Sequence, residues 1–246
     1  MRIKCIISYD GSAFNGYQVQ PNERTVQQEL QLALKKLHKG KEIKVYASGR
    51  TDTSVHAQGQ VIHFDTELHI PVEKWPIALN SLLPDDIVVL NAELVDDDFH
   101  ARFNVKKKEY RYFVQTGATP NVFLRNYRHF ISHQLNIEAM REAANYLIGT
   151  HDFTSFCSSK TEVEDKVRTI FSIDIIEEKN ELVFCFIGNG FLYNMVRILV
   201  GTLIEVGMGK RKPEDMKKVL EAKNRSVAGK TVPGKGLFLW EVVYDN

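Results

Sequence analysis

Hydrophobic and polar residues follow two different periods along this chain. Strand patterns, either alternating or as short apolar runs, occur over residues 3–9, 43–46, 60–64, 87–94, 109–115, 170–176, 182–187 and 237–243. Apolar residues at helical spacing predict helices over 25–38, 72–82, 137–148, 191–206 and 213–222. Residues 178–180 join two of the strands as a hairpin. Together these elements predict an α+β protein with a largely antiparallel central sheet and flanking helices.

The strands and helices are distributed over two halves, approximately residues 1–105 and 106–246. Neither a Gly/Ser-rich linker nor a low-complexity segment separates them. We therefore expect all 246 residues to form one unit, in which two structurally similar halves share one sheet.

A loop around Asp52 carries the candidate chemistry of the first half. Residues 48–57 have the sequence SGRTDTSVHA, in which Gly49 permits a tight backbone path and the hydroxyl residues can fix the direction of the carboxylate. Such a carboxylate is able to act as a nucleophile or a base. The alternative is structural, because aspartates in loops of this composition commonly close a turn or cap a helix.

Arg197 lies in the most apolar helix pattern of the chain, residues 191–206. A guanidinium on such a helix needs a partner, because an unpaired buried charge costs several kcal/mol and arginine does not lose its proton. Glu205 lies two turns further along the same face, so a structural ion pair between the two is one explanation.

Tyr110 belongs to a strand that begins in a run of lysines. The alternation of side chains places Lys108, Tyr110 and Tyr112 on one face of this strand. Aromatic rings beside cations suit a nucleic acid, since bases stack on the rings and phosphates meet the ammonium groups. The alternative is a half-buried strand with its tyrosines in the core; we place Tyr112 there.

Charge supports RNA binding only through its distribution, because the formal net charge is +1. Residues 208–235 contain nine basic and three acidic side chains, a net charge of +6, and five lysines form a second basic region over 35–44. Part of each region is expected to be an ordinary solvated surface. A folded RNA would be recognised mainly through its phosphates and its shape.

Other features exclude several classes of protein. The apolar stretch 191–206 is too short and too charged to span a bilayer, and residues 1–9 lack a signal-peptide pattern, so we expect a cytoplasmic protein. Cys5, Cys157 and Cys185 are far apart and support neither a disulfide framework nor a thiolate zinc site. The histidines form no metal-binding motif, and Tyr193 stands where a dinucleotide fingerprint requires its third glycine. We expect no metal and no nucleotide cofactor.

Ordered blocks from one end of the chain to the other resemble the tRNA pseudouridine synthases of the TruA family. The blocks are Tyr9-Asp10-Gly11 with Phe14, Gly16 and Gln18; Thr25-Val26-Gln27; Gly49-Arg50-Thr51-Asp52 with Val55-His56-Ala57; Ala78-Leu79-Asn80, Leu83-Pro84 and Asp86-Ile87; Phe99-His100-Ala101-Arg102; Lys108, Tyr110 and Tyr112; Gly149 and His151-Asp152-Phe153; Gly188 to Gly201 with Asn194-Met195-Val196-Arg197; and Gly236-Leu237. The chain departs from the family pattern at Thr53-Ser54, where Ala-Gly is usual, and at Tyr17, where Trp is usual.

The resemblance implies a pseudouridine synthase fold and a catalytic role for Asp52. In the family the corresponding aspartate attacks the nucleoside, and an arginine at the position of Arg197 pairs with it. The implied reaction converts uridine to pseudouridine at positions 38 to 40 of the tRNA anticodon arm, without a cofactor. The family is dimeric, so a homodimer is implied as well.

The resemblance also implies roles around the target base. Tyr110 would contact the uracil and Leu237 would pack on it. Arg50 and Arg102 would hold phosphates or occupy the gap left by a flipped nucleotide. His56 would position the Asp52 loop at the substrate.

Two other functions remain compatible with parts of the pattern. A non-catalytic tRNA-binding protein or RNA chaperone would use the basic regions and Tyr110 but not Asp52. A glycosidase would also use a carboxylate at an anomeric carbon, but no second carboxylate is identifiable near Asp52.

Overall fold

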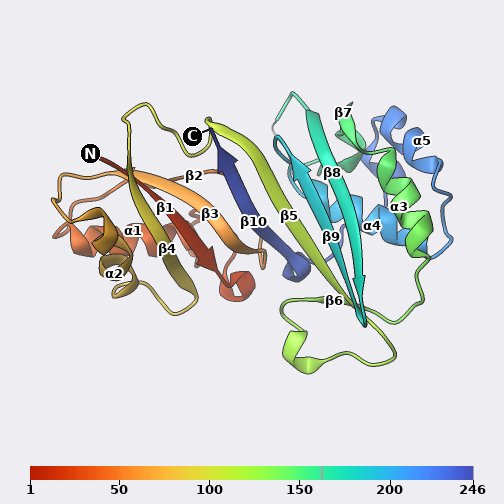
Figure 1. The fold of residues 1–246 in the computed structure, drawn as a ribbon, viewed down its shortest axis with the longest axis horizontal. Helices are drawn as coiled ribbons and strands as arrows, with labels where there is room; N and C mark the ends of the chain where they lie inside the picture. Colours follow the sequence, from red (N-terminus) through yellow and green to blue (C-terminus); the bar gives the residue numbers. More distant parts are fainter. Residues whose placement is uncertain (162, 246) are drawn as a thin grey trace. The chain divides into compact units, whose positions relative to one another are not determined.

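The computed structural model describes residues 1–161 and 163–245. The chain folds as two compact units: residues 1–106 with the last strand from Phe238 onward form the N-terminal unit, and residues 107–237 form the C-terminal unit (Figure 1). The predicted halves met at residue 105/106, close to this division, but the prediction placed the last strand in the second half. That the two halves are similar and share one sheet stays a prediction.

The N-terminal unit is built on strands in the order β4-β1-β3-β10, with β2 paired to β3. Their bounds are β1 Arg2–Tyr9, β2 Tyr46–Ala47, β3 His56–Asp65, β4 Ile87–Val95 and β10 Leu237–Tyr244. Strand β1 pairs antiparallel with both β3 and β4, whereas β10 pairs parallel with β3 at His56 and Ala57. The last strand of the chain therefore lies next to the residues that follow the Asp52 loop.

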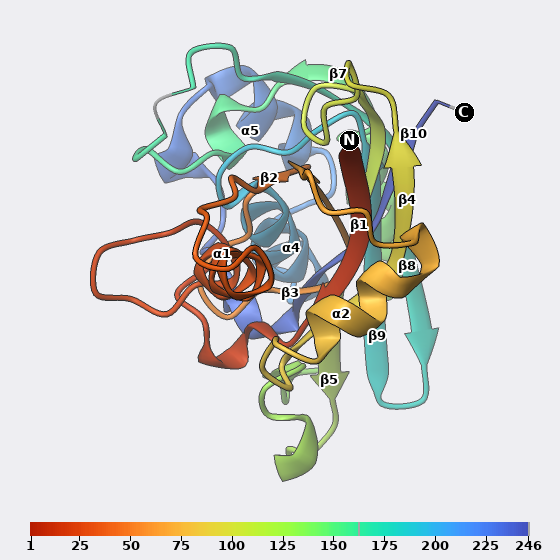
Figure 2. The ribbon, with the colours of Figure 1, turned by 90° about the vertical axis from the view of Figure 1, so that its left-hand side faces the viewer.

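Two helices complete this unit, α1 (Val26–Leu37) and α2 (Trp75–Asn80). Figure 2 looks along α1 and shows it beside β1. Every second residue of β1, from Ile3 to Tyr9, is buried, and the Trp75 side chain at the start of α2 is fully buried. The core of the unit is thus formed by one face of its sheet and the apolar faces of its helices.

The C-terminal unit has strands in the order β5-β9-β8-β7, with β6 paired to β5. Their bounds are β5 Val105–Thr116, β6 His129–Ile131, β7 Gly149–Asp152, β8 Val167–Glu178 and β9 Glu181–Gly188. Its helices are α3 (Ile137–Asn145), α4 (Met195–Gly207) and α5 (Asp215–Ala222). Helix α4 is buried along almost its whole length, as its apolar composition predicts.

The structure confirms the α+β class and the largely antiparallel pairing. The predicted hairpin is β8-β9, whose turn places Lys179 in the left-handed region with φ 47°. Several boundaries were wrong; β3 and β5 begin at His56 and Val105 rather than at 60 and 109. Helix α4 begins at Met195 rather than 191, because Asn194 takes a left-handed φ of 61°. The strand predicted over 43–46 is reduced to β2, and the helix predicted over 72–82 divides into a 3-10 turn and α2.

No helix among the described residues is long and apolar enough to cross a membrane. The described residues also contain no group of three or more His, Cys, Asp or Glu side chains arranged to hold a metal ion. The three cysteines are buried as free thiols.

Candidate active site

The loop that carries Asp52 connects β2 to β3 and is held in place by the last residue of β1 and the segment that follows it. Four hydrogen bonds join the two: the Tyr9 hydroxyl with Thr51 Oγ1 (2.7 Å), the Gly11 N–H to His56 Nδ1 (2.9 Å), the Tyr17 N–H to the Thr51 carbonyl (3.0 Å) and the Ser54 N–H to the Phe14 carbonyl (3.3 Å). Burial raises the pKa of Tyr9, so its hydroxyl stays protonated near neutral pH. The Asp52 backbone is thereby fixed on both sides.

Two glycines allow this close approach. A Cβ atom on Gly11 would lie 2.1 Å from the Val55 carbonyl oxygen, and one on Gly16 would lie 2.8 Å from the Thr51 carbonyl oxygen. Gly16 also has a φ of +86°, which side chains other than glycine's rarely adopt. Both positions therefore require glycine for the Asp52 loop to sit where it does.

The start of the loop is held from β3. Ser48 donates through its hydroxyl to Gln60 Oε1 (2.6 Å), and Gln60 Nε2 donates to the Gly49 carbonyl (2.9 Å). Both Ser48 and Gln60 are fully buried. A buried amide that satisfies neighbouring backbone and side-chain groups in this way rigidifies the loop.

His56 is buried at the end of the loop. Its Nδ1 accepts the Gly11 N–H, so this nitrogen carries no proton in this arrangement. Nδ1 also lies 3.2 Å from Asp10 Oδ1, a contact that becomes an ion pair only when the ring is protonated. The ring stacks on Phe238 with centroids 4.4 Å apart. These contacts suit a residue that positions the loop.

The side chains along the loop differ in exposure. Asp52 is half-buried, whereas Arg50 and Thr53 are exposed. Ser54 has a φ of +60°, in the left-handed region that glycine adopts without strain. The departure from the family pattern at Ser54 therefore falls on a backbone position that favours glycine.

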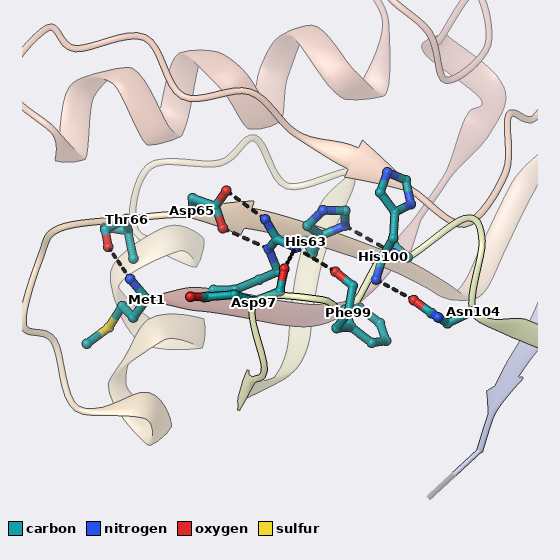
Figure 3. Close-up of polar contacts among 10 residues, drawn as sticks. Met1, His63, Asp65, Thr66, Asp97, Phe99, His100 and Asn104 are labelled. Atoms are coloured by element: carbon teal, nitrogen blue, oxygen red, sulfur yellow. Dashed lines mark hydrogen bonds and ion pairs between the residues drawn. The ribbon is translucent and has the colours of Figure 1, made fainter.

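Arg102 lies on the turn after β4. The polar contacts that anchor this turn include those of Phe99, His100 and Asn104 (Figure 3). Arg2 is paired to Asp65 at 2.8 Å and donates to the Phe99 carbonyl at 2.9 Å. The Ala101 N–H donates to Nδ1 of the buried His63 (3.1 Å). Burial lowers the pKa of His63 to about 4, which keeps this nitrogen available as an acceptor. The Arg102 side chain itself is exposed.

Arg197 lies in the first turn of α4 in the C-terminal unit and is half-buried. Its Nε donates to the Val232 carbonyl (2.8 Å) and its Nη1 to Asn194 Oδ1 (2.7 Å). Glu205, the partner in the structural alternative, forms an ion pair with Arg211 Nε through its Oε2 at 2.6 Å. The guanidinium is thus oriented by two neutral oxygens.

Tyr110 and Tyr112 lie on β5, and both are buried, with exposed fractions of 8% and 0%. The Tyr110 ring makes an edge contact with Phe191 at 5.2 Å. The Tyr112 hydroxyl donates to the Pro233 carbonyl (2.9 Å), which confirms its place in the core. Tyr112 and Arg197 therefore both hold the segment 232–236, which leads directly into Leu237.

The sequence-predicted site residues fall in both units. Arg50 and Asp52 lie on one loop of the N-terminal unit, and His56 lies at the end of that loop, where β3 begins. Arg102 belongs to the same unit. The other three, Tyr110, Arg197 and Leu237, belong to the C-terminal unit. No role was predicted for the residues that hold the Asp52 loop, namely Tyr9, Gly11, Gly16, Ser48 and Gln60. The block Tyr9-Asp10-Gly11 with Gly16 was the signal available for most of them.

Comparisons with known proteins agree on one family. A family model described as tRNA pseudouridine synthase matches residues 5–104 and 143–245. A tRNA pseudouridine synthase A of Bacillus subtilis (strain 168) is 62% identical over 247 residues, with 100% of both chains covered. Its counterpart in Anoxybacillus flavithermus is 63% identical over 245 residues, covering 100% of this chain and 99% of that one.

Solved structures give a more distant match. A Cbf5-Nop10-Gar1 complex contains a chain that is 12% identical, with a TM-score of 0.34, and the match covers 82% of this chain and 54% of that chain. A score this low adds nothing to the sequence comparisons.

Proposed function

Because the chain belongs to the tRNA pseudouridine synthase family, we propose that it isomerises uridine to pseudouridine at positions 38 to 40 of the tRNA anticodon arm. The family supplies the isomerase reaction and tRNA as the class of substrate. The target positions, the nucleophile and the absence of a cofactor are our proposal.

The observation that carries the proposal is the anchoring of Asp52. Its loop is tied by four hydrogen bonds to the segment after β1 and by Gln60 to β3, while the carboxylate-bearing residue stays half-buried. A carboxylate on a fixed backbone keeps one orientation toward a bound nucleoside, which is a requirement for a nucleophile. A turn-closing aspartate would not need such a support.

Protein side chains can supply every group that the proposed reaction needs. The bond from the ribose carbon to the ring nitrogen breaks, the uracil turns, and a bond from the same ribose carbon to a ring carbon forms. One proton leaves that ring carbon and one is added to the freed nitrogen, so no electrons are gained or lost overall. Asp52 attacks as the nucleophile and is regenerated when the new bond is complete.

Arg197 would pair with the Asp52 carboxylate and keep it ionised. The two hydrogen bonds that fix the direction of the guanidinium support this role. Tyr110 would contact the uracil and Leu237 would pack on it. The exposed Arg50 and Arg102 would meet phosphates or fill the space left by the flipped nucleotide.

The test is Asp52→Asn, which removes the carboxylate charge but keeps the shape of the side chain. We expect pseudouridine formation to be abolished while tRNA affinity stays within several-fold. Pseudouridine has the mass of uridine but reacts with carbodiimide, so carbodiimide mapping of treated tRNA measures the product and its position.

Asp85→Asn is the matched control, because Asp85 is an exposed aspartate of the same unit. It should keep wild-type turnover. If Asp52→Asn turns over at a rate near that of the wild type, Asp52 is not the nucleophile. Tight tRNA binding by the wild type without any pseudouridine would instead favour the RNA chaperone.

A further inference from the structure

A cavity in the C-terminal unit is lined by residues that have no part in the proposed chemistry. It has a volume of about 620 Å³ and lies between the segment after β7 and the segment after α5. Its lining residues are Thr154, Cys157, Ser158, Ser159, Thr161, Lys166, Ala222, Lys223, Asn224 and Arg225. Of these described residues three are cations and none is an acid.

Arg225 contributes a half-buried guanidinium. Among the described residues it donates to two neutral oxygens, the Ala228 carbonyl (3.4 Å) and Thr231 Oγ1 (3.0 Å). Burial lowers its pKa, but arginine remains charged at any ordinary pH. The Glu205 carboxylate opposes part of this effect without forming an ion pair with Arg225. A partly desolvated charge outside an ion pair costs free energy, which an incoming anion would recover.

Lys166, which belongs to the segment after β7, contributes the second charge. It is half-buried, and within residues 1–161 and 163–245 no carboxylate lies within ion-pair distance of its Nζ. Its neighbour in the cavity, Cys157, is no counter-charge, because burial raises the pKa of that thiol and keeps it neutral. Lys223 differs, since it is paired to Asp152 at 3.0 Å. Lys166 and Arg225 therefore form no ion pair with a described carboxylate, although Glu205, which is itself paired to Arg211, favours the charge of Arg225 from a distance.

The rest of the lining suits a phosphate. Hydroxyl groups of serine and threonine and the Asn224 amide supply neutral hydrogen-bonding groups around the cations. Among the described lining residues there is no aromatic ring on which a base could stack, and Ala222 is the only aliphatic side chain. Lys223 and Arg225 also belong to the stretch 208–235 with its net charge of +6, for which the proposed chemistry has no use.

We infer that this cavity binds a backbone phosphate of the tRNA substrate, held mainly by Lys166 and Arg225. The inference rests on the proposed function, because it takes tRNA as the ligand. The contact orients the RNA and carries no base specificity. Removing it should weaken binding without changing the chemical step.

The experiment compares Lys166→Gln/Arg225→Gln with the wild type in tRNA binding at several salt concentrations. We expect affinity to fall at least about tenfold at moderate salt. The slope of log K against log salt should become shallower by about one, because one phosphate contact is lost. Turnover at saturating tRNA should be unchanged, so the defect appears in KM.

Lys74→Gln/Lys179→Gln is the matched control, since both lysines are exposed, lie outside the two basic regions and carry the same total charge. Its affinity should stay within about twofold of wild type. An equal loss in both double variants would overturn the inference, because the effect would then be one of net charge. Arg225→Lys, which retains the charge, should keep most of the affinity and the salt slope.

Two further measurements separate the remaining outcomes. Unfolding of each variant by urea shows whether the cavity still folds, and a folded double variant with wild-type tRNA binding overturns the inference. If inorganic phosphate at constant ionic strength stabilises the wild type but the double variant binds tRNA normally, the cavity takes free phosphate and not RNA. A wild type that neither binds tRNA nor forms pseudouridine would instead refute the proposed function itself.

Discussion

At the scale of single residues, the hydroxyl of Tyr110 can be separated from its ring. The ring is buried against Phe191, so Tyr110→Ala should lose both packing and base contact, whereas Tyr110→Phe loses only the hydroxyl. If the hydroxyl relays the proton that leaves the ring carbon, Tyr110→Phe should bind tRNA normally and turn over at least about tenfold more slowly. Single-turnover kinetics with saturating enzyme measure this step. Wild-type rates in both variants would return Tyr110 to a purely structural role.

His63 gives the molecule a pH-dependent stability. Burial lowers its pKa to about 4, against an ordinary value near 6.5, with further lowering by His100 and Arg2 and an opposing effect of Asp65. Between pH 6.5 and 4 the unfolded state therefore binds more protons at this residue than the folded state, and stability falls as the pH falls. In His63→Gln, whose amide oxygen can accept the Ala101 N–H, this part of the loss should disappear. Urea unfolding of both proteins from pH 7 to pH 4 tests it, and parallel curves would contradict it.

At the scale of the elements, the fixed position of the Asp52 loop depends on Gly16. Gly16→Ala combines a left-handed φ of +86° with a Cβ atom 2.8 Å from the Thr51 carbonyl. Gly40→Ala is its control, because Gly40 has a φ of +98° but no atom within 4 Å of the added Cβ. We expect Gly40→Ala to cost about 1 kcal/mol of unfolding free energy and Gly16→Ala clearly more. Only Gly16→Ala should also slow turnover, since it displaces the loop; equal effects would show that the loop tolerates movement.

At the scale of the whole molecule, we predict a homodimer in which one tRNA touches both chains. The family resemblance implies the dimer, and a two-fold assembly would extend the basic surface. With six or more phosphates neutralised, tRNA affinity should fall roughly a thousandfold or more between 50 and 200 mM salt. Mixing an Asp52→Asn chain with a chain whose basic residues in 208–235 are neutralised should restore activity that neither parent has. A monomer by sedimentation, fully active at the same concentration, would refute this.

The sequence by itself determined most elements and the choice of candidate site residues. Helix α1 and strand β1 begin and end within a residue of the predicted positions, because periodicity of apolar residues is a local property of the chain. The candidate residues could be named because each lies in a recognisable block. The periodicity shows which face of an element is buried but not what covers it, and everything that depends on the partner was decided by the tertiary structure.

Three features show this dependence. The last strand pairs with β3 at His56 and Ala57. These strands lie far apart in the sequence, so no local pattern encodes the contact. Helical spacing placed Glu205 on the same face as Arg197. In the structure Glu205 forms an ion pair with Arg211, which lies on the loop after α4. The cavity of Lys166 and Arg225 joins two segments that lie far apart in the sequence. Hydrogen bonds, ion pairs and cavities between distant segments arise only when the chain has packed, and therefore only the folded structure specifies them.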